Sequence, residues 1–329
     1  MQAGEVARVT PRAAENSWLT RVAAAVHERV VGQDEAVEGL LIALLTGGHI
    51  LLEGLPGLAK TLMVRTLAEA LDTQFRRIQF TPDLLPTDIV GTPVFDPKSG
   101  DFRIHKGPIF SNIVLADEIN RAPPKVQAAL LEAMEERQVT LGGETYALAS
   151  PFMVLATQNP VELHGTYPLA EAQLDRFALK LEIGYPTREQ EKTIVGRVAG
   201  GSPLPLAPVG TVAQILADRE HVAAVHLEEK ILDYIVDLTC ATRNPSAYGL
   251  QDLAGLIEFG ASPRATIFLT RSARARAYLR GRNFVMPDDV KAMAPAVMRH
   301  RLKTTYEADA RGIDAAEIIR RVLATVPAP

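Results

Sequence analysis

One stretch of the sequence has the residue types of a phosphate-binding loop. Residues 54–61 read GLPGLAKT and follow a short apolar run. In the pattern G-x-x-x-x-G-K-[ST], backbone N–H groups surround the phosphates, the lysine reaches the β- and γ-phosphate oxygens, and the hydroxyl binds Mg²⁺. Gly54, Lys60 and Thr61 match this pattern, whereas Ala59 stands where the pattern has glycine. Taken alone, the stretch also fits a turn between a strand and a helix.

Two carboxylates follow a second apolar run. Asp117 and Glu118 come directly after residues 113–116, which have the composition of a buried central strand. In an open α/β sheet, ligands bind beyond the carboxyl ends of the strands. This position suits Asp117 for binding Mg²⁺ and Glu118 for polarising a water that attacks the γ-phosphate. A solvated loop is the alternative, and the phosphate loop upstream makes it the weaker interpretation.

Three further polar residues stand where they could complete a nucleotide site. Asn159 follows a third apolar run, where an amide can orient a water or contact a phosphate, although the residue also suits the start of an Asn-Pro turn. Arg176 lies near the end of a short helix expected over 170–177, where an arginine is usually solvated or salt-bridged. Arg264 lies in the first turn of a helix whose expected N-cap is Ser262.

The apolar patterns predict an α/β fold that positions these residues. A strand, the glycine-rich loop and a helix follow one another over residues 50–71, which is the context that the motif requires. The N-terminus of such a helix directs a partial positive charge at bound phosphates. The first expected helix ends at the glycines 47 and 48. Further core strands are expected over 76–80, 113–116, 152–156 and 179–183.

Two stretches of this half are predicted β-hairpins outside the main sheet. The insert over 88–106 has a turn at 97–100 flanked by Phe95 and Phe102. Residues 139–148 alternate on both sides of a Gly-Gly turn. Inserts of this length in a compact domain tend to be functional.

The second half of the chain has an all-helical pattern. A length of 329 residues predicts about two domains. We expect a poorly ordered arm over 1–16, an α/β domain over 17–185 and a helical domain over 186–329. A last helix over 288–302 is expected to lead into a short tail. The arginines between 264 and 282 are dispersed around a helix, which favours a solvated face over a phosphate-binding patch.

Composition limits the partners and the compartment. The net charge of −4 and the pI near 6.0 give no overall attraction to nucleic acid or to an anionic membrane. The single cysteine, Cys240, excludes an internal disulfide and a multi-cysteine metal site. The sequence shows no apolar stretch near 18 residues and no signal-peptide pattern. We therefore expect a cytoplasmic protein without membrane insertion, whose partners are proteins or small molecules.

The order of these motifs resembles that of the AAA+ ATPases, and the residues within them resemble those of the MoxR family. The family usually has alanine at the position of Ala59. The resemblance runs from about residue 30 to residue 301 and implies a P-loop NTPase parallel sheet followed by a smaller all-α lid domain. The blocks that carry it are VVGQ, EGLPGLAKT, FTPDLLPTDIVG, GPIFSNIVLADEINRAPPKVQAALLEAMEE, ATQNP, YPLAEAQLDRF and GASPRA.

The resemblance implies a role for each matching residue of the first domain. Lys60 and Thr61 would belong to the Walker A motif. Asp117 and Glu118 would form the Walker B motif, with Glu118 as the catalytic base. Asn159 would be sensor 1.

The resemblance also implies two arginine roles and an adenine contact. Arg264 would be sensor 2, and Arg176 would be the arginine finger that reaches the nucleotide of the neighbouring subunit. Val31 and Gly32 would contact the adenine. The implied catalytic residues are Lys60, Glu118, Asn159, Arg176 and Arg264, and Thr61 and Asp117 would bind Mg²⁺. The implied nucleotide-binding residues are Val31, Gly32, Gly54, Leu55, Pro56, Gly57, Leu58, Ala59, Lys60, Thr61, Leu62, Asp117 and Arg264.

The implied function is Mg²⁺-dependent ATP hydrolysis to ADP and phosphate by a homo-oligomeric ring, typically a hexamer. Such rings remodel or mature a client protein complex in a chaperone-like way, often with a von Willebrand factor A-type domain protein. The two inserts would face the pore or the client. A nucleic-acid-dependent motor is one alternative, because helicase-related ATPases also carry such inserts and because the stretch 264–282 is basic. A nucleotide-gated scaffold that needs no turnover is another.

Overall fold

The computed structural model describes residues 17–98, 100–159, 165–199 and 206–329. The arm expected over 1–16 lies outside these ranges, as does most of the glycine- and proline-rich connector that begins at residue 200. In the described part of the chain, no helix combines the length and the apolar content that crossing a membrane requires.

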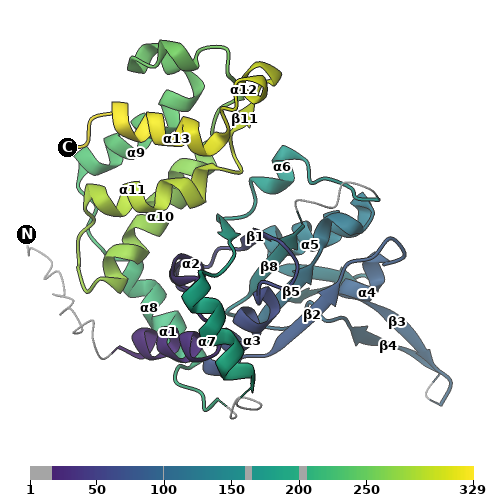
Figure 1. Cartoon of the computed structure of the whole chain (residues 1–329). Coiled ribbons are helices and arrows are strands. Elements are labelled where there is room, and N and C mark those ends of the chain that lie inside the picture. The colour runs from purple at the N-terminus through teal and green to yellow at the C-terminus, as the bar shows by residue number, and fades with distance from the viewer. Residues whose placement is uncertain (1–16, 99, 160–164, 200–205) are drawn as a thin grey trace, which may run out of the picture.

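A five-stranded parallel sheet forms the centre of the α/β part (Figure 1). Because neighbouring strands are parallel, the carboxyl ends of all five strands lie at one edge of the sheet. This confirms the α/β class with a parallel sheet. The strand order is β2 (Phe75–Gln79), β5 (Ile113–Asp117), β8 (Met153–Gln158), β1 (Ile50–Gly54) and β9 (Leu179–Ile183).

Helices cover both faces of the sheet because successive strand residues point to opposite sides. Ile50 and Leu52 of β1 belong to a core with α1 (Trp18–Arg29), α2 (Asp34–Thr46) and α3 (Lys60–Ala70). Leu51 belongs to a second core on the other face. That core includes residues of α4 (Pro86–Val90) and α5 (Pro124–Glu136).

Both predicted hairpins are confirmed. One consists of β3 (Gly91–Asp96) and β4 (Asp101–Lys106), which extend away from the sheet in Figure 1. The other consists of β6 (Gln138–Leu141) and β7 (Glu144–Ala147). The two hairpins touch, since a Cβ at Gly142 would lie 3.2 Å from the side chain of Ile104. The inserts therefore form one projecting unit.

The helical part follows β9 and packs against the α/β part through α2. Helices α8 and α10 both contact α2, and the first core continues into the helical part without interruption. The elements after β9 are α7 (Arg188–Ala199), α8 (Val212–Ala223), α9 (Glu229–Arg243), β10 (Ile257–Phe259), α10 (Pro263–Leu279), α11 (Pro287–Met298), β11 (Lys303–Thr304), α12 (Tyr306–Ala310) and α13 (Ala315–Thr325). Short 3₁₀ helices cover Ile119–Arg121, Pro245–Tyr248 and Gln251–Leu253, and α6 (Glu171–Leu174) precedes β9.

One expectation about the helical part is wrong, and a second holds only in part. The short tail after residue 302 contains α12 and α13, and the N–H of Glu317 donates to the Asp314 side chain at 2.8 Å to cap α13. The arginines over 264–282 are solvated only in part: Arg271 and Arg280 are exposed, whereas two others point inward. Arg276 and Arg282 donate to the fully buried carboxylate of Asp289 at 2.9 and 2.7 Å. A buried carboxylate needs such partners, which draws these arginines inward.

His49, directly before β1, is a buried neutral histidine. Its Nδ1 accepts a hydrogen bond from the Val154 N–H at 2.9 Å, and its Nε2 donates to the Met134 carbonyl at 3.1 Å. Burial, together with the nearby charge of Arg137, lowers the pKa of His49 from 6.5 to about 3.

We expect acid to destabilise the protein through His49. Its folded pKa lies below its unfolded value, so the unfolded chain takes up the proton first, and this contribution to stability is complete only above the unfolded pKa. Between about pH 6.5 and about pH 5 the loss is about 2 kcal/mol. Urea unfolding across this range should show a shallower pH dependence for His49→Gln. The same pH dependence in both proteins would contradict the assignment.

Candidate active site

The phosphate loop connects β1 to α3, in the order that its motif requires. Ala59 is the N-cap residue of α3 and has φ 58° and ψ 19°, in the left-handed region. Alanine is about 1 kcal/mol less favourable than glycine there. Gly57 has φ 85°, and a Cβ at this position would meet no atom within 4 Å. The loop is therefore open on the side where a ligand would lie.

Lys60 begins α3 and faces the carboxylates of the neighbouring strands. Its Nζ donates to the Gly54 carbonyl at 2.6 Å. Burial lowers the pKa of Lys60, while the negative charges of Asp117, Glu118 and Glu53 raise it. The phosphate loop and the end of β5 thus act on the same ammonium group.

Asp117 ends β5, and both of its carboxylate oxygens accept hydrogen bonds. Thr157 Oγ1 donates to Oδ1 at 2.6 Å, and Arg77 donates to Oδ2 through Nη2 at 2.7 Å and Nε at 2.9 Å. Arg77 comes from β2 and Thr157 from β8, because β5 lies between these strands. Sequence reasoning missed both residues. The only signal for Thr157 is a hydroxyl directly after an apolar run.

Glu118 follows β5 with a left-handed backbone, φ 57° and ψ 51°. Its N–H donates to Thr157 Oγ1 at 2.8 Å, so one hydroxyl joins the two neighbouring acidic residues. The Glu118 carboxylate accepts from Gln79 Nε2 at 2.7 Å and from Arg121 Nη1 at 3.0 Å. Sequence reasoning also missed these two side chains, which fix the position of the Glu118 carboxylate.

Asn159 leaves the sheet between the loop and the carboxylates. It directly follows β8, which lies between β1 and β5, and only 7% of it is exposed. Strand order therefore brings Lys60, Asp117, Glu118 and Asn159 to one edge of the sheet, as expected from the sequence.

The donor set at this edge fits Mg²⁺. The described residues contain no group of three His, Cys, Asp or Glu side chains that could hold a metal ion by themselves. Mg²⁺ keeps several waters and is usually bound by one or two carboxylates together with substrate phosphates. Thr61 and Asp117 supply a hydroxyl and one carboxylate, which suits an ion that arrives with a nucleotide.

A pocket of about 170 Å³ lies beside the phosphate loop and is suited to the adenine base of a nucleotide. Val31, Leu58, Ala59 and Leu62 line it as expected. Gly32 lies nearby with φ 72°, where the Gln190 side chain leaves no space for a Cβ. Sequence reasoning missed six other lining residues, which come from the segment after β9 and from the end of α1 and the residues that follow it: Pro186, Ile194, Arg197, Arg29, Val30 and Gln33.

Arg176 and Arg264 lie at the opposite edge of the sheet. Both line a pocket of about 270 Å³ together with residues 47–49, which precede β1. A strand of five residues rises about 16 Å, and the phosphate loop begins at the far end of β1. Within one subunit, the structure does not bring these arginines to Lys60.

The helix expected over 170–177 is shorter, which changes the setting of Arg176. Helix α6 ends at Leu174, so Arg176 lies in the turn after it. The physical reason is that Arg301 donates to the carbonyls of Asp175 and Phe177, at 3.0 and 2.5 Å, and so stabilises a non-helical turn.

One carboxylate holds both arginines. Glu135, near the end of α5, accepts from Arg176 Nε at 2.9 Å and from Arg264 Nη2 at 2.5 Å. Since Arg264 belongs to α10, these contacts join the two parts of the molecule. Arg137 and Arg271 line the same pocket. Positive charge therefore exceeds negative charge there, as in a site for a polyphosphate. Nothing in the sequence distinguishes Glu135 from the other glutamates of α5.

Fold and site together define an AAA-type ATPase module followed by its lid. Residues 49–179 match the ATPase family associated with various cellular activities (AAA), and residues 253–322 match the AAA lid domain. Within this class, the chain belongs to the MoxR family.

Three similar proteins illustrate the relationship. Chaperone MoxR1 from Mycobacterium tuberculosis is 47% identical over 96% of this chain and 84% of its own length. Protein MoxR from Methylorubrum extorquens is 34% identical over 94% of this chain and 96% of its own length. A solved protein from Cytophaga hutchinsonii, described as a candidate ATPase, is 47% identical and superposes with a TM-score of 0.90 over 95% of both chains.

We expect Thr157→Val to lower ATP turnover while leaving ATP binding intact. Valine keeps the shape but removes the hydroxyl that links Asp117 to the Glu118 N–H. Leaving a buried donor unpaired costs about 1–3 kcal/mol, which corresponds to a loss of roughly 10-fold or more in turnover. Steady-state hydrolysis and nucleotide titration measure the two effects. Thr157→Ser keeps the hydroxyl and is the control. Equal turnover in all three proteins would count against the link.

Proposed function

We propose that this protein hydrolyses ATP to ADP and phosphate, with Mg²⁺ as cofactor, and that assembly into a ring completes each active site. The phosphate loop and the two arginines at opposite edges of one sheet carry this proposal. A head-to-tail contact between subunits, repeated until it closes, sets one edge against the other. A hexamer is the ring that the family resemblance implies. Each bound nucleotide then meets Arg176 and Arg264 of a neighbour.

Each residue of the carboxyl edge has a separate task in this proposal. Lys60 binds the β- and γ-phosphate oxygens, and Asn159 orients the attacking water. Glu118 takes the proton of that water. Thr61 and Asp117 hold Mg²⁺, which neutralises charge on the phosphates when it is bound.

We also propose that hydrolysis drives chaperone-like remodelling of a protein complex in the cytoplasm, with a von Willebrand factor A-type domain protein as partner. A relative that is 47% identical is named a chaperone. The domain division is 17–185 for the ATPase and 186–329 for the lid. The client would meet the hairpins over 88–106 and 139–148. Phe95 and Phe102 support this, since they are 52% and 70% exposed on the first hairpin.

A nucleic-acid-dependent motor has less support. The basic stretch 264–282 is one ground for that alternative, but four of its six arginines pair with carboxylates of the same subunit, and Arg264 and Arg271 line the pocket of about 270 Å³ described above. Arg276 and Arg282 bind Asp289, and Arg280 binds Glu38 at 3.0 Å. A patch that contacts phosphates needs free cations on one face.

We expect two inactive variants to restore each other on mixing. Lys60→Ala removes a phosphate ligand but keeps the arginine finger, whereas Arg176→Ala keeps the phosphate loop. Each variant alone should lose ATP turnover, by roughly 10³-fold for Arg176→Ala. In mixed rings, some sites pair an intact phosphate loop with an intact Arg176. Hydrolysis measured against mixing ratio should rise to a maximum, and a flat profile would show that Arg176 does not act on a neighbour.

We expect Glu118→Gln to bind ATP and assemble but neither hydrolyse ATP nor support the client. Glutamine preserves the shape but cannot take the proton of the attacking water. Nucleotide titration, phosphate release and maturation of the client in vivo are the three measurements. Client maturation without hydrolysis would instead favour a nucleotide-gated scaffold. Unchanged hydrolysis would exclude Glu118 as the base.

A further inference from the structure

The position of Arg176 depends on its neighbours, because Arg176 lies in a turn. The N–H groups of this turn bond locally: Arg176 N donates to the Gln173 carbonyl at 3.3 Å, and Phe177 N donates to the Leu174 carbonyl at 3.1 Å. The carbonyls that follow α6 accept no hydrogen bond from a later turn of the helix, because the helix has ended. Buried carbonyls need donors, so these must be supplied from elsewhere.

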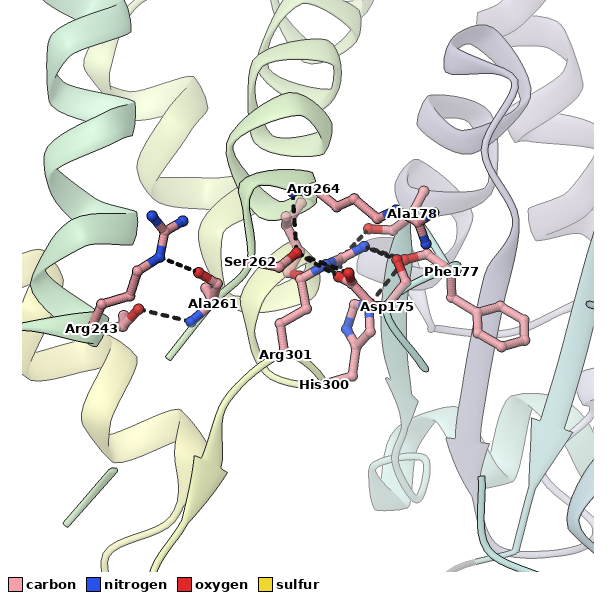
Figure 2. A network of polar contacts seen from close by, with 11 residues as sticks. Asp175, Phe177, Ala178, Arg243, Ala261, Ser262, Arg264, His300 and Arg301 are labelled. Atoms are coloured by element: carbon pink, nitrogen blue, oxygen red, sulfur yellow. Dashed lines mark hydrogen bonds and ion pairs between the residues drawn. The ribbon is translucent and has the colours of Figure 1, made fainter. Parts of the chain in front are cut away.

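Arg301, which follows α11, supplies those donors (Figure 2). Its Nη2 donates to the carbonyls of Asp175 and Phe177 at 3.0 and 2.5 Å, and its Nη1 donates to the carbonyl of Ala178 at 3.3 Å. Its Nε donates to Asp175 Oδ1 at 2.7 Å. One guanidinium of the helical part therefore holds the backbone on both sides of Arg176.

A second donor of the helical part reaches the same carboxylate. Ser262 Oγ lies 2.8 and 3.0 Å from the two carboxylate oxygens of Asp175. The same Oγ accepts from the N–H of Arg264 at 3.1 Å as the N-cap of α10. Figure 2 shows Asp175 between Ser262 and Arg301. The two arginines that bind Glu135 are thus fixed by one junction.

A gain in stability alone does not account for this junction, because burying its charges costs free energy. The side chain of Arg301 is 1% exposed, and the Phe268 ring covers its guanidinium at 5.0 Å. Burial lowers the pKa of Arg301 to about 10, against the opposing charge of Asp175, so it stays charged at neutral pH. A buried ion pair is often no more stabilising than apolar residues of the same volume. What the guanidinium adds is orientation, since its planar donors bind acceptors at fixed angles.

Another ion pair joins the same two parts without touching this turn. Arg299 Nη1 lies 2.6 Å from Glu182 on β9. It comes from the same stretch of chain as Arg301, carries the same charge and also crosses from the helical part to the sheet. Arg299 therefore provides a matched comparison.

We propose that Arg301 and Ser262 are positioning residues for Arg176, so that the helical part of each subunit sets the arginine that the subunit presents to its neighbour. This inference rests on the proposed action of Arg176 in trans. Neither residue lines the pocket beside the phosphate loop of its own subunit. Arg301 acts through the turn that carries Arg176, and Ser262 acts through that turn and through the N-cap of α10.

Steady-state ATP hydrolysis by the assembled full-length protein tests the inference. Arg301→Lys keeps the charge but loses the planar donors, and Ser262→Ala loses the donor to Asp175. We expect both to lower kcat roughly 10- to 100-fold, the cost of a misplaced catalytic group, with KM for ATP within about two-fold of the original. Ser262→Thr keeps a hydroxyl and should retain kcat. The control Arg299→Gln should retain kcat as well.

The double variant Arg176→Ala/Arg301→Lys separates positioning from a general structural effect. If Arg301 acts through Arg176, the double variant is no slower than Arg176→Ala alone. Further slowing, or equal losses in Arg299→Gln, overturns the inference. Full activity of Ser262→Ala and Arg301→Lys, together with slow hydrolysis by Arg176→Ala, also overturns the inference. That result leaves the proposed function intact. Full activity of Arg176→Ala would show that Arg176 does not act in trans and would therefore overturn this inference as well. Should Arg301→Lys fail to fold, the two Ser262 variants decide.

Discussion

The parallel direction of the sheet is the constraint on which the rest of the structure depends. Parallel strands place all their carboxyl ends at one edge, so the loop after β1, the carboxylates after β5 and the amide after β8 meet there. The same direction places the turn before β9, which carries Arg176, at the other edge. One subunit therefore keeps these two groups of residues apart, and in the proposed ring a second subunit supplies the missing group.

Each group of residues has its own counter-ions within the subunit. Arg77 contacts the carboxylate proposed for Mg²⁺, and Arg121 contacts the proposed base. Glu135 serves the same purpose for the two arginines of the other edge. A separated subunit thus avoids like charges that face one another without partners. In the proposed ring, contact between subunits would exchange these internal ion pairs for phosphate and metal, and hydrolysis would then depend on how closely the subunits approach.

Local features of the site could be predicted from sequence, and features that depend on strand order could not. The loop with Lys60 and the acidic residue Glu118 are continuous with the strands that carry them, so apolar runs were enough to place them. Thr157 could not be predicted as a site residue, because its contact with Asp117 depends on the pairing of β8 with β5, which no short motif encodes. Glu135 matters because α10 returns to the end of α5 from more than a hundred residues away. Helix α13 was missed for a different reason: it lies with its cap, Asp314, inside the stretch after residue 302 that was expected to be a tail.

The burial of α2 has a consequence for how the chain folds. Nine of its residues are buried, because the sheet covers one side while α8 and α10 cover another. A fragment ending after β9 would leave that apolar side in water and would associate rather than remain monomeric. The boundary between ATPase and lid therefore separates two functions inside one cooperative folding unit. An engineered exchange of the lid would therefore have to include the helix beneath it.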